Sequence, residues 1–131
     1  MRRAIFDTNV IISAFWFPDS IPGRALTIAI REGELVLTEW IIGELHEVVL
    51  RKSPDGLPAL RGFLNRVPYE LVSPGEAGGI SISDKDDQPI LDAAIAGDVD
   101  TIVTGDKHFL QLGLTRPRVM TPREYLALPP A

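Results

Sequence analysis

The chain has 131 residues, a net charge of −5 and no cysteine. This length suits one domain with its own core, so we expect a single domain over residues 1–131. The lack of cysteine excludes disulfides and thiolate metal sites. No apolar run approaches the roughly 20 residues that a membrane span needs, and Asp7 and Asn9 interrupt any signal-peptide core. We therefore expect a cytoplasmic protein with no membrane partner.

The first half of the chain predicts two strands and four helices. The strands are the short apolar runs at residues 4–6 and 35–37, each followed by a polar residue. The first helix opens over residues 10–15, and two others span about 24–31 and 57–66. Between these two lies a helix capped by Thr38, with an apolar stripe of Ile41, Leu45, Val48 and Val49. Residues 51–56 have the composition of a turn.

The second half continues the alternation of strands and helices. Strands are predicted at residues 69–72, 101–103 and 118–120, and residues 73–84 have the composition of a loop. A helix that begins near Asp87 ends at Gly97, and residues 121–124 cap a last helix. Such alternation predicts an α/β fold with a mainly parallel sheet.

The negative charge is concentrated in one segment. Between Asp84 and Asp106 there are seven Asp and one Lys, a local charge of −6, so the rest of the chain carries +1. A solvated acidic surface is one interpretation of such a run, and a divalent-cation site is the other. Asp87 favours a site, because it shares a helix face with the apolar Leu91 and Ala94. The alternative for Asp87 is a second capping residue beside Asp84 or Asp86.

Two further acids, Asp7 and Asp106, follow predicted strands. Sites in parallel sheets form outside the carboxyl ends of the strands, so these carboxylates converge if the first and fourth strands are neighbours. Glu44 and Asp87, near the starts of helices, would complete a pocket of four acids. Mg²⁺ or Mn²⁺ would relieve their repulsion and could activate a water for phosphodiester hydrolysis. Zinc is disfavoured, because its nitrogen ligands would have to come from two histidines.

These acids lie in segments that resemble a known family. Asp7-Thr8-Asn9-Val10, after a strand, resembles the opening motif of PIN-domain nucleases. Glu44 matches that family's acid in the helix after the second strand, Asp87 resembles its third acidic motif, and Val103-Thr104-Gly105-Asp106-Lys107 resembles its fourth. The match covers nearly the whole chain, in the right order. In its length and in the Thr-Gly-Asp-Lys form of the fourth motif, the chain resembles the single-domain prokaryotic, VapC-like branch of the family. Many members of that branch are toxins of toxin–antitoxin pairs.

The resemblance implies a three-layer α/β/α sandwich with a parallel sheet of strand order 3-2-1-4-5. It also implies a ribonuclease that depends on one or two Mg²⁺ or Mn²⁺ ions. By the family pattern, the catalytic and metal-binding acids are Asp7, Glu44, Asp87 and Asp106, supported by Thr8, Asn9 and Thr104. The segment after Asp106 lacks the further acid that some members carry and has His108 near that place.

Two other functions compete with the nuclease. A receiver-like signalling domain also places acids, a Thr and a Lys around Mg²⁺, here Thr104 and Lys107. It would need paired acids after the first strand, and Phe6-Asp7-Thr8 supplies one. A PIN fold that binds RNA or protein without cutting is the other, and the four intact acids argue against it.

The sequence carries fewer signals for binding partners than for the acidic site. We expect an RNA substrate, an antitoxin protein and a homodimer or higher oligomer. The bulky run Phe15-Trp16-Phe17-Pro18 is either core or a contact surface for such a partner. The basic residues expected to meet phosphates are Arg24, Arg31, Arg51, Lys52, Arg61 and Arg66.

Overall fold

The strands form one parallel sheet in the order β3-β2-β1-β4-β5. Their bounds are β1 Arg3–Phe6, β2 Glu34–Thr38, β3 Glu70–Val72, β4 Thr101–Val103 and β5 Arg118–Met120. The computed structural model describes residues 2–73 and 88–129. The order and the parallel pairing confirm the predicted fold class. They differ from the order 2-1-3-4-5 of receiver-type domains, so the receiver alternative is wrong.

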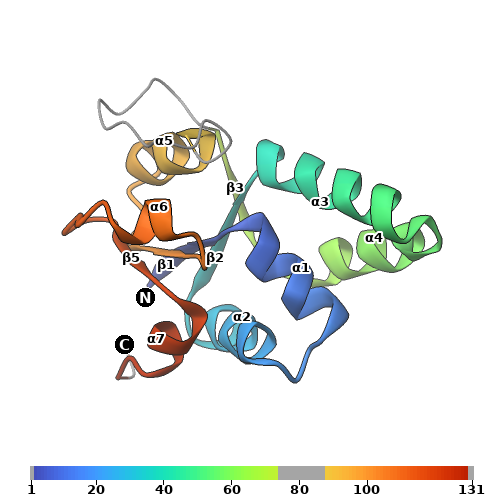
Figure 1. The fold of residues 1–131 in the computed structure, drawn as a ribbon, viewed down its shortest axis with the longest axis horizontal. Helices are drawn as coiled ribbons and strands as arrows, with labels where there is room; N and C mark the ends of the chain where they lie inside the picture. The colour runs from blue at the N-terminus through green and yellow to red at the C-terminus, as the bar shows by residue number, and fades with distance from the viewer. Residues whose placement is uncertain (1, 74–87, 130–131) are drawn as a thin grey trace.

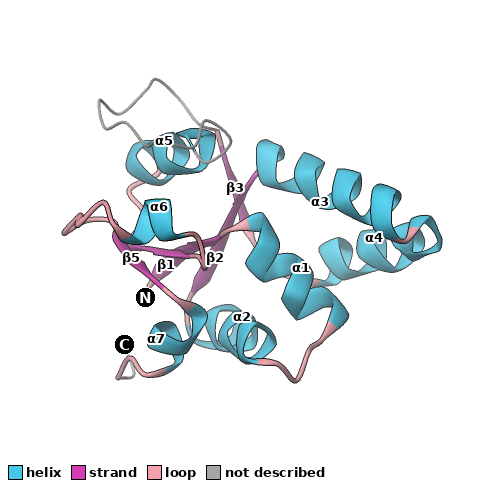
Figure 2. Cartoon of the chain, in the orientation of Figure 1, coloured by secondary structure: helices cyan, strands magenta, loops and turns pink. Residues whose placement is uncertain are grey.

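The helices connect the strands and cover the sheet. Their bounds are α1 Thr8–Trp16, α2 Ile21–Glu32, α3 Glu39–Lys52, α4 Leu57–Arg66, α5 Gln88–Ala96, α6 Lys107–Leu110 and α7 Pro122–Leu126, with a 3-10 turn at Pro54–Gly56. In Figure 1, α2 and α7 lie on one side of the sheet and α5 and α6 on the other. The helices α3 and α4 form a pair at one end of the molecule, as Figure 2 also shows. The arrangement is the predicted three-layer sandwich.

The central strand β1 explains why layers form on both sides. Ala4, Ile5 and Phe6 are all fully buried, although successive side chains of a strand point to opposite faces. Both faces must therefore be covered by apolar helix stripes, which is the usual state of a parallel sheet. In α5 the buried residues are Ile90, Leu91, Ala93 and Ala94, so the predicted apolar face of this helix is confirmed.

Several boundaries differ from the predictions for local reasons. The helix α2 starts at Ile21 rather than Arg24, because Ser20 accepts a hydrogen bond from the Gly23 amide and Pro22 fits the first turn. The turn expected over residues 51–56 is wrong at its start, since α3 continues through Lys52. Short α6 has no apolar periodicity long enough to predict it, and it begins where Asp106 caps it.

The aromatic run after α1 divides between core and surface. Phe15 and Trp16 are partly buried against the core, and the Phe15 ring packs on Phe63 of α4 with centroids 5.4 Å apart. Phe17, in contrast, is 66% exposed. Within the described residues, no helix is both long and apolar enough to cross a membrane.

Candidate active site

The carboxyl ends of β1 and β4 lie side by side. Phe6 pairs with Val103 in the sheet, and the Asp7 amide donates to the Val103 carbonyl at 3.0 Å. The chain leaves β1 toward β2 on one side, whereas β4 lies on the other side, so the strand order reverses at this point. Such a reversal opens a crevice above the strand ends. Asp7 and Thr104, the residues that follow the two strands, stand at this crevice.

Asp7 is a buried carboxylate held in one orientation. Its side chain is at the N-terminus of α1, where Oδ1 accepts from the Asn9 amide at 3.0 Å. Its Oδ2 accepts from the Thr104 hydroxyl at 2.6 Å, and the residue is only 5% exposed. Burying a charge is costly, and these two hydrogen bonds together with the positive end of the helix dipole offset that cost. The carboxylate therefore has little freedom to rotate.

Thr104 connects Asp7 to the second acid of the strand ends. It is completely buried, and its hydroxyl oxygen accepts from the Asp106 amide at 3.0 Å while the same hydroxyl donates to Asp7. Asp106 in turn caps α6 by accepting from the His108 amide at 2.7 Å. Asp7 and Asp106 are therefore tied to a common hydroxyl by short links.

Glu44 reaches the same region from α3. It is half-buried, and its Oε1 accepts from the hydroxyl of Thr8 at 2.7 Å. Thr8 is the first residue of α1 and is itself buried, so this hydrogen bond joins α3 to the end of β1. The predicted acid of the helix after β2 is thus brought to the predicted acid after β1.

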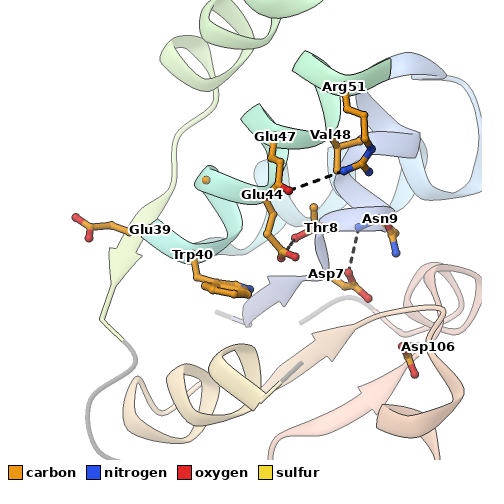
Figure 3. Close-up of a pocket in the computed structure, with 11 residues that line it drawn as sticks. Asp7, Thr8, Asn9, Glu39, Trp40, Glu44, Glu47, Val48, Arg51 and Asp106 are labelled. Carbon is orange, nitrogen blue, oxygen red and sulfur yellow. Dashed lines mark hydrogen bonds and ion pairs between the residues drawn. The ribbon is translucent and has the colours of Figure 1, made fainter. Parts of the chain in front are cut away.

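These residues line one cavity of about 690 Å³ (Figure 3). The residues that line it are Asp7, Thr8, Asn9, Glu39, Trp40, Gly43, Glu44, Glu47, Val48, Arg51 and Asp106. They carry five carboxylates and one guanidinium, a formal charge of −4. A cavity of this charge repels phosphate groups unless cations occupy it.

The lining contains three of the four predicted acids: Asp7, Glu44 and Asp106. The fourth, Asp87, lies outside the described residues, as do Asp84 and Asp86. Within residues 2–73 and 88–129, no three Asp, Glu or His side chains come close enough together to hold a metal ion by themselves. The three acids share a cavity without forming a compact cluster there.

Other lining residues extend the site along α3. Trp40, Glu44, Glu47 and Arg51 are spaced i, i+4, i+7 and i+11, so one face of the helix points into the cavity. Glu39 and Glu47 are exposed and also line the cavity. The helical spacing from Glu44 was the signal that could have identified Trp40 and Arg51 as site residues.

The donor set is suitable for a hard divalent cation. Mg²⁺ and Mn²⁺ prefer carboxylate oxygens and water, and carboxylates dominate this lining. The hydrogen bonds to Asp7 and Glu44 come from hydroxyl and amide donors. Such second contacts are what orient carboxylates that bind metals.

Comparisons with known proteins agree with the fold and with these motifs. The family model of the PIN domain matches residues 3–108. A chain of the crystal structure of VapBC2 from Rickettsia felis, bound to a DNA fragment from their promoter, superposes with a TM-score of 0.66 at 20% sequence identity. The match covers 90% of this chain and 96% of that one. No curated protein sequence matches the chain. Since the family model spans most of its length, this chain belongs to the PIN domain family, a family of nucleases.

Proposed function

We propose that this protein is a divalent-metal-dependent ribonuclease that hydrolyses phosphodiester bonds of RNA. The observation that carries the proposal is the placement of Asp7. It is buried at the point where the strand order reverses, it is oriented by Asn9 and Thr104, and it faces a cavity shared with Glu44 and Asp106. An acidic cavity at a switch point suits a reaction that needs cations to bring two negative partners together.

The four acids Asp7, Glu44, Asp87 and Asp106 would hold Mg²⁺ or Mn²⁺. When bound, the cation would supply water activation and neutralise charge on the scissile phosphate. The protein's own part is to orient the carboxylates. Thr104 fixes Asp7, and Thr8 fixes Glu44, so neither carboxylate has to reorganise when the substrate arrives. Asn9 is exposed at the cavity and can donate from its side-chain amide to a phosphate oxygen.

Arg51 is suited to meet the phosphates of the RNA on either side of the cleaved bond. It is the one basic residue among the described residues that line the cavity. Arg51 forms an ion pair with Glu47 that has a long N–O distance of 3.9 Å between two well-exposed side chains. Such surface pairs contribute little, so the guanidinium can exchange Glu47 for a phosphate at small cost.

We further propose that the protein is a toxin that pairs with an antitoxin and forms a homodimer. The similar structure from Rickettsia felis is a VapBC2 complex bound to promoter DNA. In this chain the exposed Phe17 offers an aromatic contact of the kind that is enriched at protein interfaces. Size determination of the protein alone and after co-expression with its neighbouring open reading frame would test both points.

The nuclease proposal is tested with purified protein and single-stranded or loop-containing RNA. Cleavage should occur with Mg²⁺ or Mn²⁺ and stop with EDTA, and no covalent protein–RNA adduct should accumulate. Because such enzymes can be narrow in what they accept, a randomised RNA pool with sequencing of the products is the right substrate. Absence of cleavage in that pool, together with RNA binding, would instead favour a PIN fold that binds without cutting.

A further inference from the structure

Trp40 is an exposed aromatic residue at the edge of an acidic cavity. It occupies the second position of α3 and is 41% exposed, although tryptophan is usually buried for the most part. Figure 3 shows its indole on the side of α3 that also carries Glu44. It therefore lies on the cavity-facing stripe, next to the acids, and not on the stripe of Ile41, Leu45 and Val49 that packs into the core.

Gly43 leaves space beside this indole. It lines the same cavity one turn after Trp40, and a Cβ added there would meet no atom within 4 Å. Packing therefore does not require glycine at position 43, and glycine inside a helix is less stable than alanine. Residues at i and i+3 are neighbours on a helix surface, so the bare backbone at Gly43 keeps the surface next to the Trp40 ring open.

We propose that Trp40 is a stacking platform for a base of single-stranded RNA, with Gly43 providing the room for that base. This inference rests on the proposed nuclease function and names the form of substrate it would accept. A flat aromatic ring stacks on any base, because every base has a π-face, but it can do so only when the base is not stacked within a duplex. With Arg51 eleven residues further along the same helix face, α3 offers a base contact at one end and a phosphate contact at the other.

The length of α3 agrees with this geometry. At about 1.5 Å per residue, the eleven steps from Trp40 to Arg51 span roughly 16 Å along the helix. Glu44 lies between these two contacts, nearer to Trp40. An RNA strand that runs along α3 from Trp40 to Arg51 would pass over the acids. The base stacked on Trp40 therefore belongs to a nucleotide close to the cleaved bond.

Fluorescence tests the stacking directly. The chain has two tryptophans, Trp16 and Trp40, so Trp16→Phe leaves Trp40 as the only indole reporter. Stopped-flow mixing with a short single-stranded RNA of randomised sequence in Mg²⁺ should quench this fluorescence before cleavage accumulates. The same RNA annealed to its complement should quench much less. If Trp16→Phe does not fold, the signal of the unmodified protein minus that of Trp40→Leu gives the same reading.

Variants separate stacking from a structural role. Trp40→Leu should weaken single-stranded RNA binding about tenfold or more, whereas Trp40→Phe should retain most of it. Gly43→Leu should raise the melting temperature by a few degrees and still weaken RNA binding, because its side chain fills the space of the base. A purely structural position would not give higher stability with lower affinity. Leu50→Ala, which changes an exposed apolar residue of the same helix outside the cavity lining, is the control and should leave RNA binding unchanged.

The outcomes distinguish this inference from the nuclease proposal. One outcome is that the unmodified protein cleaves RNA, its fluorescence is not quenched, and Trp40→Leu binds RNA as well as the unmodified protein does. This outcome would overturn the stacking role of Trp40 but support the nuclease proposal, and Trp40 would then be a contact for a protein. Quenching by RNA without any cleavage would support the stacking role and count against the nuclease. A protein that neither cuts RNA nor shows quenching would overturn both.

Discussion

The hydroxyl of Thr104 donates a hydrogen bond of 2.6 Å to Oδ2 of Asp7, across 97 residues of sequence. The bond joins the residue after β4 to the residue after β1, and both side chains are buried. It is the contact that turns two neighbouring strand ends into one oriented acidic site. The stability and the activity of the protein should therefore both respond to Thr104.

Thr104→Val should lower both the stability and the activity of the protein. Valine has nearly the shape of threonine but leaves a buried carboxylate oxygen and the Asp106 amide without the hydroxyl they share. We expect a loss of about 1–3 kcal/mol in the free energy of unfolding and a clear fall in kcat. Thr101→Val is the control, a buried threonine at the other end of the same strand, and should keep its activity. Denaturant unfolding and RNA cleavage measure the two effects, and full activity in Thr104→Val would contradict the orienting role.

Asp7→Asn should abolish cleavage while the protein stays folded. Asparagine is as good an N-cap as aspartate, so the hydrogen bond from the Asn9 amide can persist. The negative charge that would bind a cation is lost, and we expect activity to fall roughly 100-fold or more. Circular dichroism confirms the fold, and cleavage of an RNA that the unmodified protein cuts gives the rate.

Glu44→Gln should lose cleavage activity as Asp7→Asn does, because the hydrogen bond from Thr8 holds Glu44 at the cavity. Glu47 is not a suitable control, since it lines the same cavity. Glu32, at the end of α2 and absent from the cavity lining, serves better, and Glu32→Gln should retain full activity. Equal loss in the two variants would mean that charge in general, and not this site, supports the reaction.

Mg²⁺ or Mn²⁺ should raise the melting temperature. A ligand that binds only the folded protein stabilises it by about 1.4 kcal/mol for each tenfold excess over its dissociation constant. The effect should be strong here because a cation relieves repulsion among the five carboxylates of the cavity. Thermal scans against metal concentration measure it, and Asp7→Asn should reduce the shift. A melting temperature that does not change with millimolar divalent cations would contradict the proposed metal site.

Arg51→Gln should weaken RNA binding with little dependence on RNA sequence. A residue that meets a phosphate contributes to the salt dependence of binding, so the slope of log K against log salt should fall by about 0.7 for single-stranded RNA. Arg123→Gln, on α7 and outside the cavity lining, is the control. Binding titrations at several salt concentrations decide between a phosphate contact and a surface charge paired with Glu47.

The amino end of the sheet should be sensitive to acid. Arg3 of β1 forms ion pairs with Glu34 of β2 and Glu70 of β3, and this contact holds the pKa of Glu70 below its usual value. A lowered pKa stabilises the folded protein above the unfolded value, and the stabilisation is lost as the pH falls through the folded value. Melting temperatures below about pH 5 should therefore decline less steeply in Glu70→Gln than in the unmodified protein. Parallel curves for the two proteins would show that the pair contributes nothing.

Local rules of the sequence were sufficient for most of the fold. Short apolar runs predicted the strands, and caps such as Thr38 placed helix starts correctly, because these features depend on neighbours within a few residues. The sequence also placed Asp7 and Asp106 after strands. Parallel strands end at the same edge of a sheet, so the prediction that these two acids meet followed as soon as β1 and β4 were taken as neighbours.

Only the tertiary structure decided how the site is held and how far it extends. Thr104 was expected to support the site, but its bond to Asp7 depends on a distance between segments 97 residues apart. Likewise, the helical period shows that Trp40, Glu44 and Arg51 share a face of α3, but it does not show what that face meets. That choice is made by packing, since the stripe of Ile41, Leu45 and Val49 is buried in the core and thereby turns the neighbouring polar face toward the end of β1.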